Sequence, residues 1–178
     1  MMTSPIKLTP KAGEARRRRF SSTDGLRWVE ELAARRGWEE ANRSYLESMR
    51  ERGFQEMSAL MEAAGVGGTV SREDAFQLLE AVLAVYLPEA RAARTTDDAG
   101  DPVLTIEVQE CPTFARIEQS GWHGVTACGS WHRRQGWYRA LGMSVLDTVV
   151  GEKKWGDVAC ATLVKIPEAA SEQERGRG

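Results

Sequence analysis

Cys128 and His132 lie four residues apart in a stretch, 126–141, whose pattern predicts a helix ended by Gly142. Residues four apart on a helix leave the same face one turn apart, so this thiol and imidazole would be neighbours. Such a pair could bind one metal ion, or the imidazole could activate the thiol as a nucleophile. Cys128 would lie near the helix N-terminus, where the helix dipole favours a thiolate. The third alternative is a cysteine that only packs, as buried thiols often do.

The other two cysteines could join this pair. Cys111 lies where a predicted strand ends, before Pro112, and Cys160 lies early in the last predicted strand. A sheet packed on the 126–141 helix could bring both thiols close to Cys128. Three thiolates and the imidazole of His132 would form a tetrahedral set suited to zinc. We therefore expect Cys111, Cys128, Cys160 and His132 to bind a divalent metal such as zinc, and otherwise no cofactor, although their spacing matches no zinc-finger pattern.

Four further residues are candidates for the same site. His123 lies on a glycine-flanked loop a few residues before the helix and is a second candidate for acid–base catalysis, after Cys128 and His132. Gln135 and Arg139 share the helical stripe of Cys128 and His132, and Trp131 is the nearest aromatic side chain on that helix. Gln135, Arg139 and Trp131 are therefore expected to bind the substrate.

The same helix is rich in aromatic and basic side chains. Trp137 and Tyr138 could line an apolar pocket, but their commoner role is to anchor a helix to a sheet. Arg133, Arg134 and Arg139 could bind a carboxylate if they faced inward, but we expect a solvated helix face.

The elements that must position these residues follow from hydrophobic periodicity. Apolar positions at helical spacing predict three helices in the first half, and alternating apolar residues predict strands in the second half. The expected helices are 23–36, 39–64, 71–87 and 126–141, and the expected strands are 103–109, 114–118, 144–150 and 158–166. Helices followed by strands predict an α+β fold, with an N-terminal helical layer packed on a small antiparallel sheet and one further helix.

The chain of 178 residues suits one domain. We expect a flexible tail over 1–22, a single domain over 23–166 and a flexible tail over 167–178. Within the domain, 23–94 is expected to be helical and 103–166 rich in strands, with a loop or hinge over 95–101.

Composition excludes several classes of protein. The net charge of −2 lacks the basic excess of nucleic-acid or membrane-surface binders, and no apolar run reaches the length of a membrane span. The arginines at 16–19 are not followed by the apolar core of a secretory signal. We therefore expect a cytoplasmic protein whose three cysteines are not a disulfide framework, without nucleic-acid or membrane partners.

Short motifs give the chain a resemblance to known families. The strand end Val108-Gln-Glu-Cys-Pro112, a second cysteine opening a helix, the strand 145–150, and Gly156-Asp-Val-Ala-Cys160 resemble the 4-vinyl reductase domain. The front half is similar to the L-2-amino-thiazoline-4-carboxylic acid hydrolase family at Trp28, Gly37, Ala41 and Gly53. The resemblance covers roughly residues 26–166. It departs from the family pattern in the 126–141 helix, which has bulky residues where the family often has small ones.

The resemblance implies a helical layer against a twisted antiparallel sheet, a homodimer, and a shared metal or thiol site at Cys111, Cys128 and Cys160. The leading functional hypothesis is a hydrolase of a small metabolite that opens a nitrogen- or sulfur-containing ring or cleaves an amide-like C–N bond. A bound metal would activate water, or Cys128 would attack with His132 as base. The alternative is a non-catalytic module that binds or senses a small molecule in the same pocket.

Overall fold

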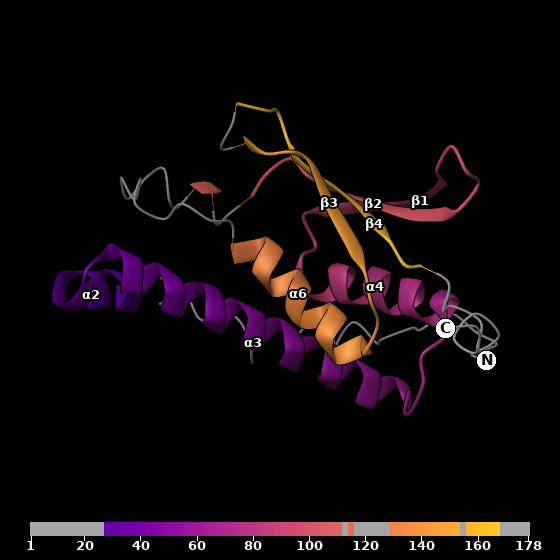
Figure 1. Ribbon diagram of the computed structural model, residues 1–178, viewed down its shortest axis with the longest axis horizontal. Helices are drawn as coiled ribbons and strands as arrows, with labels where there is room; N and C mark the ends of the chain where they lie inside the picture. Colours follow the sequence, from indigo (N-terminus) through magenta and orange to yellow (C-terminus); the bar gives the residue numbers. More distant parts are fainter. Residues whose placement is uncertain (1–26, 112–113, 116–128, 154–155, 168–178) are drawn as a thin grey trace, which may run out of the picture.

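The computed structural model describes residues 27–111, 114–115, 129–153 and 156–167 (Figure 1). Four helices and four strands form an α+β fold, which confirms the predicted fold class. In chain order they are α2 (Arg27–Arg36), α3 (Trp38–Ala64), α4 (Arg72–Tyr86), β1 (Ala90–Thr96), β2 (Pro102–Val108), α6 (Gly129–Leu141), β3 (Leu146–Gly151) and β4 (Cys160–Lys165). The expected tail at 1–22, and the expected tail at 167–178 apart from Pro167, lie outside the described residues.

The first three helices confirm the periodicity, and their ends follow from local chemistry. Gly37, with φ of 86°, separates α2 from α3, and Gly65 ends α3 in a left-handed conformation. Both positions favour glycine because a Cβ disfavours positive φ. The Ser71 side chain accepts a hydrogen bond from the Asp74 backbone N–H at 3.1 Å, which caps the start of α4. None of the described helices is long and apolar enough to cross a membrane.

The sheet is antiparallel, with strand order β1-β2-β4-β3, so that β1 and β3 form its two edges. The sequence predicted β2, β3 and β4 but not β1. The β1 sequence, Ala-Arg-Ala-Ala-Arg-Thr-Thr, has little intrinsic strand preference. It becomes a strand because a short hairpin pairs it with β2 from Ala90↔Val108 to Thr96↔Pro102.

Two further expectations were wrong in detail. Thr95 and Thr96 belong to β1 rather than to a loop, so the strand-rich part begins at 90 instead of 103. The short strand expected at 114–118 is helical at 114–115, and its remainder lies outside the described residues. The helix expected at 126–141 is confirmed from Gly129 to Leu141.

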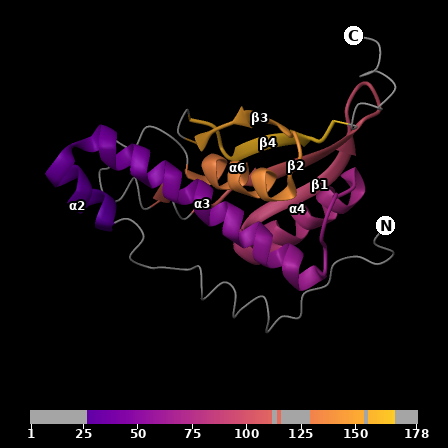
Figure 2. The same cartoon turned by 60° about the horizontal axis from the view of Figure 1, so that its bottom comes forward.

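The helix α6 lies between α3 and the sheet (Figure 1; Figure 2). Glycines allow α3 and α6 to come into backbone contact. A Cβ on Gly53 would overlap the backbone carbonyl of Arg133, and one on Gly136 would overlap that of Arg50. Because the two backbones touch at this crossing, it sets the distance between α3 and α6 and so the position of α6 relative to α3.

The main core fills the space between the helices and the inner face of the sheet. Its fully buried members include Phe76, Leu79 and Leu104, together with Trp137 from α6 and Val164 from β4. A second, smaller cluster of Val29, Ala41 and Tyr45 joins α2 to the first half of α3. The core therefore includes buried side chains of α6, the helix on which four of the eight predicted site residues lie.

Candidate functional site

A buried ion pair fixes one side of α6. Glu56 of α3 has no exposed surface, and its carboxylate accepts two hydrogen bonds from the Arg133 guanidinium, at 2.6 and 2.7 Å. The Trp137 indole N–H donates to the same carboxylate at 3.1 Å, and Arg52 donates from one turn before it on α3. Arg133 also donates to the Tyr86 carbonyl at the end of α4. This cluster fastens α6 to both α3 and α4.

A second ion pair fixes the opposite side of α6. Arg134 donates to both carboxylate oxygens of Asp147 on β3, at 2.9 and 3.3 Å, and to the Thr162 hydroxyl on β4. The Tyr138 hydroxyl donates to the same carboxylate at 2.8 Å, and burial raises the pKa of that phenol. Consecutive helical residues point about 100° apart. Arg133 can therefore contact the helices α3 and α4 while Arg134, the next residue, contacts the sheet.

These contacts correct the expectation of a solvated arginine face. Arg133 and Arg134 are both buried, because each meets a carboxylate that the sequence analysis had not placed inside the protein. The expected anchoring to the sheet is confirmed for Tyr138, which bonds to Asp147 of β3, whereas Trp137 anchors α6 to α3 instead.

His132 lies on the α3 side of α6, half-buried. Its Nδ1 lies 3.0 Å from the Arg50 guanidinium. Burial, and to a lesser degree the Arg50 charge, lower the pKa of His132 below its ordinary value. A guanidinium has no acceptor, so Nδ1 accepts this bond and the neutral ring carries its proton on Nε2. The geometry therefore presents an N–H donor at Nε2.

Three predicted substrate-binding residues lie on α6 with His132. The ring of Trp131 meets that of His132 edge-on, with centroids 4.9 Å apart. Arg139 is exposed, donates to Glu51 at 2.8 Å and lies over the ring of Phe54 at 4.3 Å, both on α3. Gln135 is half-buried. At His132 and Arg139 the predicted stripe of α6 therefore meets α3.

The two described cysteines lie at one end of the sheet. Cys160 begins β4 opposite Val108, the last residue of β2, and Cys111 follows three residues later. Both are half-buried, and the Cys111 sulfur accepts a hydrogen bond from the Phe114 backbone N–H at 3.4 Å. Cys128 and His123 lie outside the described residues.

The metal expectation can be compared with the described geometry only in part. Across 27–111, 114–115, 129–153 and 156–167, no three side chains of His, Cys, Asp or Glu are grouped as metal ligands. The four-residue set with Cys128 stays a prediction. For His132 the Arg50 contact opposes ligation, because it occupies the Nδ1 lone pair and adds a nearby positive charge.

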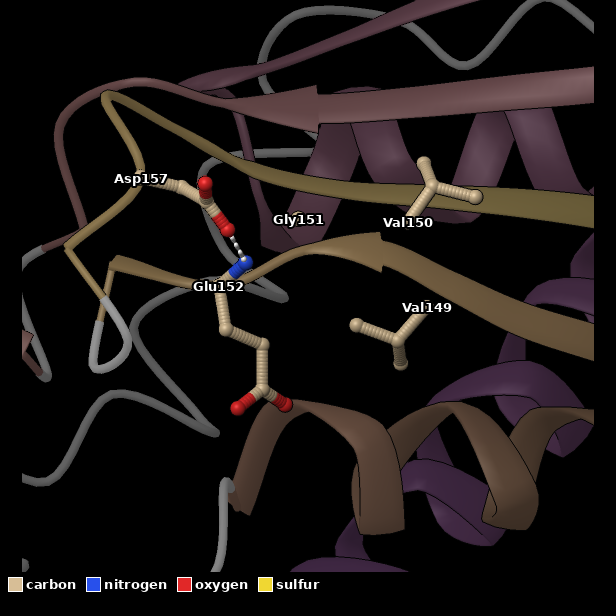
Figure 3. A pocket seen from close by; sticks show the side chains of 5 residues that line it. All are labelled: Val149, Val150, Gly151, Glu152 and Asp157. Atoms are coloured by element: carbon tan, nitrogen blue, oxygen red, sulfur yellow. Dashed lines mark hydrogen bonds between the residues drawn. The ribbon is translucent and has the colours of Figure 1, made fainter.

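An open depression of about 510 Å³ lies at the same end of the sheet (Figure 3). It is lined by Val149, Val150, Gly151, Glu152 and Asp157. The Asp157 carboxylate accepts a hydrogen bond from the Glu152 backbone N–H at 2.8 Å and so ties the two sides of the β3–β4 connection. Nearby, Lys153 donates to the Gln109 carbonyl at 2.8 Å, which joins this connection to the segment after β2.

Glu56 and Asp147 were not expected from the sequence, although Glu56 carried one signal. Glu56 lies three residues after Gly53 and four before Leu60, on the apolar stripe of α3 rather than on its charged faces. Asp147 carries no comparable signal, since an acidic residue in an edge strand is ordinarily exposed.

Comparison with known proteins gives one kind of match. No family model matches the sequence, and no curated protein matches it. Among solved structures, the chain is similar to the phenol-responsive sensory domain of the transcription activator PoxR, crystallised with phenol. The two are 17% identical in sequence, with a TM-score of 0.52 over 96% of each chain. The chain thus shares its fold with that sensory domain.

Proposed function

We propose that this protein is a non-catalytic module that binds and senses a small ring compound. The observation that carries the proposal is the likeness in fold to a phenol-responsive sensory domain along nearly the whole of both chains. A shared fold does not by itself determine function. The proposal therefore also rests on the chemistry of this chain's own side chains.

The state of His132 supports binding rather than catalysis. A general base must offer a lone pair, but Nδ1 of His132 already accepts from Arg50 and Nε2 carries the proton. An N–H donor beside the Trp131 ring suits a ligand with an aromatic ring and a hydroxyl or carbonyl oxygen. We therefore propose that Trp131 and His132 contact the ring and the oxygen of the ligand, with Gln135 nearby.

Thermal unfolding with phenol and related ring compounds tests this proposal. We expect phenol or a close analogue to raise the melting temperature of the wild-type protein in a saturable way. Trp131→Ala should abolish that shift, whereas Trp38→Ala, which removes an exposed indole at the start of α3, should keep it. A wild-type protein whose melting temperature no ring compound changes would refute the proposal.

Hydrolysis remains the rival hypothesis, and the same samples can test it. A hydrolase would convert cyclic amidines or amides to products seen by mass spectrometry, and His132→Ala would stop product formation. A sensing module would be stabilised by its ligand and return it unchanged.

Zinc binding through the cysteines is a separate part of the proposal. The side chains of Cys111 and Cys160 lie at the same end of the sheet, and as thiolates they would be suitable zinc ligands that stabilise the fold there. Metal analysis of the purified protein should then show zinc that is lost in a Cys111→Ser, Cys160→Ser double variant. Wild-type protein without bound zinc would contradict this part alone.

A further inference from the structure

The exposed apolar side chains of this protein gather at one edge of the sheet. In the described part of the chain, seven large apolar side chains are exposed, and five of them lie on β3, on β4 or between these strands. These five are Leu146, Val149, Val150, Val158 and Leu163. Leu146 and Val150 are each more than half exposed. Thr148 of β3 pairs with Leu163 of β4, so the apolar surface continues from the edge onto the neighbouring strand.

The backbone of β3 is open to pairing. Among the described strands, β3 is the last of the order β1-β2-β4-β3, and within this part of the chain it bonds only to β4. The outer side of an edge strand presents backbone N–H and C=O groups that a further extended strand can satisfy. A partner for this edge must therefore be a strand.

The charges of the two edges differ. The single charged residue of β3 is Asp147, whose side chain is 1% exposed and bound to Arg134 beneath the sheet. The opposite edge, β1, carries Arg91 and Arg94 and adjoins a hairpin with three aspartates. Proteins commonly protect edges with such charges, and β3 lacks this protection.

We propose that β3 pairs in antiparallel fashion with β3 of a second copy of this chain, forming a continuous eight-stranded sheet. A two-fold axis near Thr148 would bring Leu146 of one copy close to Val150 of the other. The two Asp147 carboxylates would not repel each other, because each is already paired with Arg134 of its own chain. Two-fold pairing of β3 with β3 closes after two chains. Pairing of β3 with β1 of another copy would instead continue from chain to chain without limit, and it would place apolar residues against the arginines of β1.

The shape of the edge fits this pairing. A bulge between Val149 and Gly151 bends the far end of β3, and the stretch Leu146–Val149 keeps regular pairing with β4. In Figure 3, Val149 and Val150 point to opposite sides of the strand. In a two-fold antiparallel pair, the regular stretch of each copy lies opposite the bulged end of the other, with apolar side chains available on both faces of the joint sheet.

Light scattering during size-exclusion chromatography of the full chain tests the proposal. We expect twice the chain mass at tens of micromolar for the wild type, and the monomer mass for a Leu146→Lys, Val150→Lys double variant. The matched control is Ala93→Lys, an exposed substitution on the other edge strand, which should stay dimeric. A monomeric wild type, or a double variant that stays dimeric, would overturn the proposal.

A cross-linking experiment tests the same interface without the double variant, which could lose the dimer simply because it misfolds. Thr148→Cys should give a disulfide-linked dimer under mild oxidation, whereas Ala93→Cys should give no more than the wild-type background from the native cysteines. Equal cross-linking of the two variants would also overturn the proposal. Neither result depends on whether a ring compound binds, so this inference and the proposed function can fail separately.

Discussion

At the scale of single residues, the Glu56 carboxylate determines how the interior of the protein is organised. It lies on α3 with no exposed surface and accepts hydrogen bonds from Arg133, Arg52 and Trp137. Removing one partner of a buried ion pair is costly because the other charge stays buried without compensation. The free energy of unfolding should therefore depend strongly on this residue.

We expect Glu56→Ala to lower the free energy of unfolding by about 3–5 kcal/mol, measured by urea denaturation, because Arg133 would stay buried without its carboxylate. Glu51→Gln on the same helix is the control. It removes the ion pair with the exposed Arg139 and should leave the denaturation midpoint nearly unchanged. Similar losses in the two variants would contradict the importance assigned to burial here.

His132 should make stability depend on pH. Its pKa is lowered in the folded protein, so below its ordinary value near 6.5 the unfolded chain binds a proton more readily than the folded one. The stabilisation is complete above pH 6.5 and is lost as the pH falls through the folded-state pKa.

We expect the urea midpoint to fall between about pH 7 and about pH 5, and to fall less in His132→Asn, which cannot be protonated. The difference between the two profiles isolates His132 from every other titrating group. Two parallel profiles would show that the imidazole does not contribute.

At the scale of elements, the crossing of α3 and α6 depends on glycine. A Cβ on Gly136 would overlap the Arg50 carbonyl and come too close to the backbone of the next turn of α3. Backbone cannot move aside as a flexible side chain can. Alanine would gain roughly 1 kcal/mol in helix propensity at this position, but the overlap should outweigh that gain.

Gly136→Ala should therefore lower the melting temperature, with a loss of about 1–3 kcal/mol typical of overpacking. Gly67→Ala is a matched control, because a Cβ there meets nothing within 4 Å. A Gly136→Ala protein as stable as the wild type would show that the two helices can separate without cost.

The elements also show what the sequence could and could not predict. The helices followed from apolar periodicity, and β2, β3 and β4 from alternation or short apolar runs. β1 could not be found in this way, because its Ala- and Arg-rich sequence becomes a strand only by pairing with β2. The Cys128–His132 spacing correctly placed His132 on a helix. It could not reveal that Arg50, eighty-two positions away in the chain, would occupy Nδ1.

At the scale of the whole molecule, α6 connects the other helices to the sheet. α6 is bonded to α3 through Arg133 and to the strands β3 and β4 through Arg134. A ligand at Trp131 and His132 would lie on the same helix that is bonded to the edge strand β3. Ligand binding and pairing of the sheet edges are therefore separate proposals that meet at one structural element.

The adjacent arginines also limit how this helix can change during evolution. Inserting or deleting one residue in α6 between Gly129 and Arg133 would shift its N-terminal turn by about 100° relative to the two arginines. The same change between Arg134 and Trp137 would turn the indole away from Glu56. Related proteins that keep both ion pairs should therefore tolerate length changes only in the connections before and after α6.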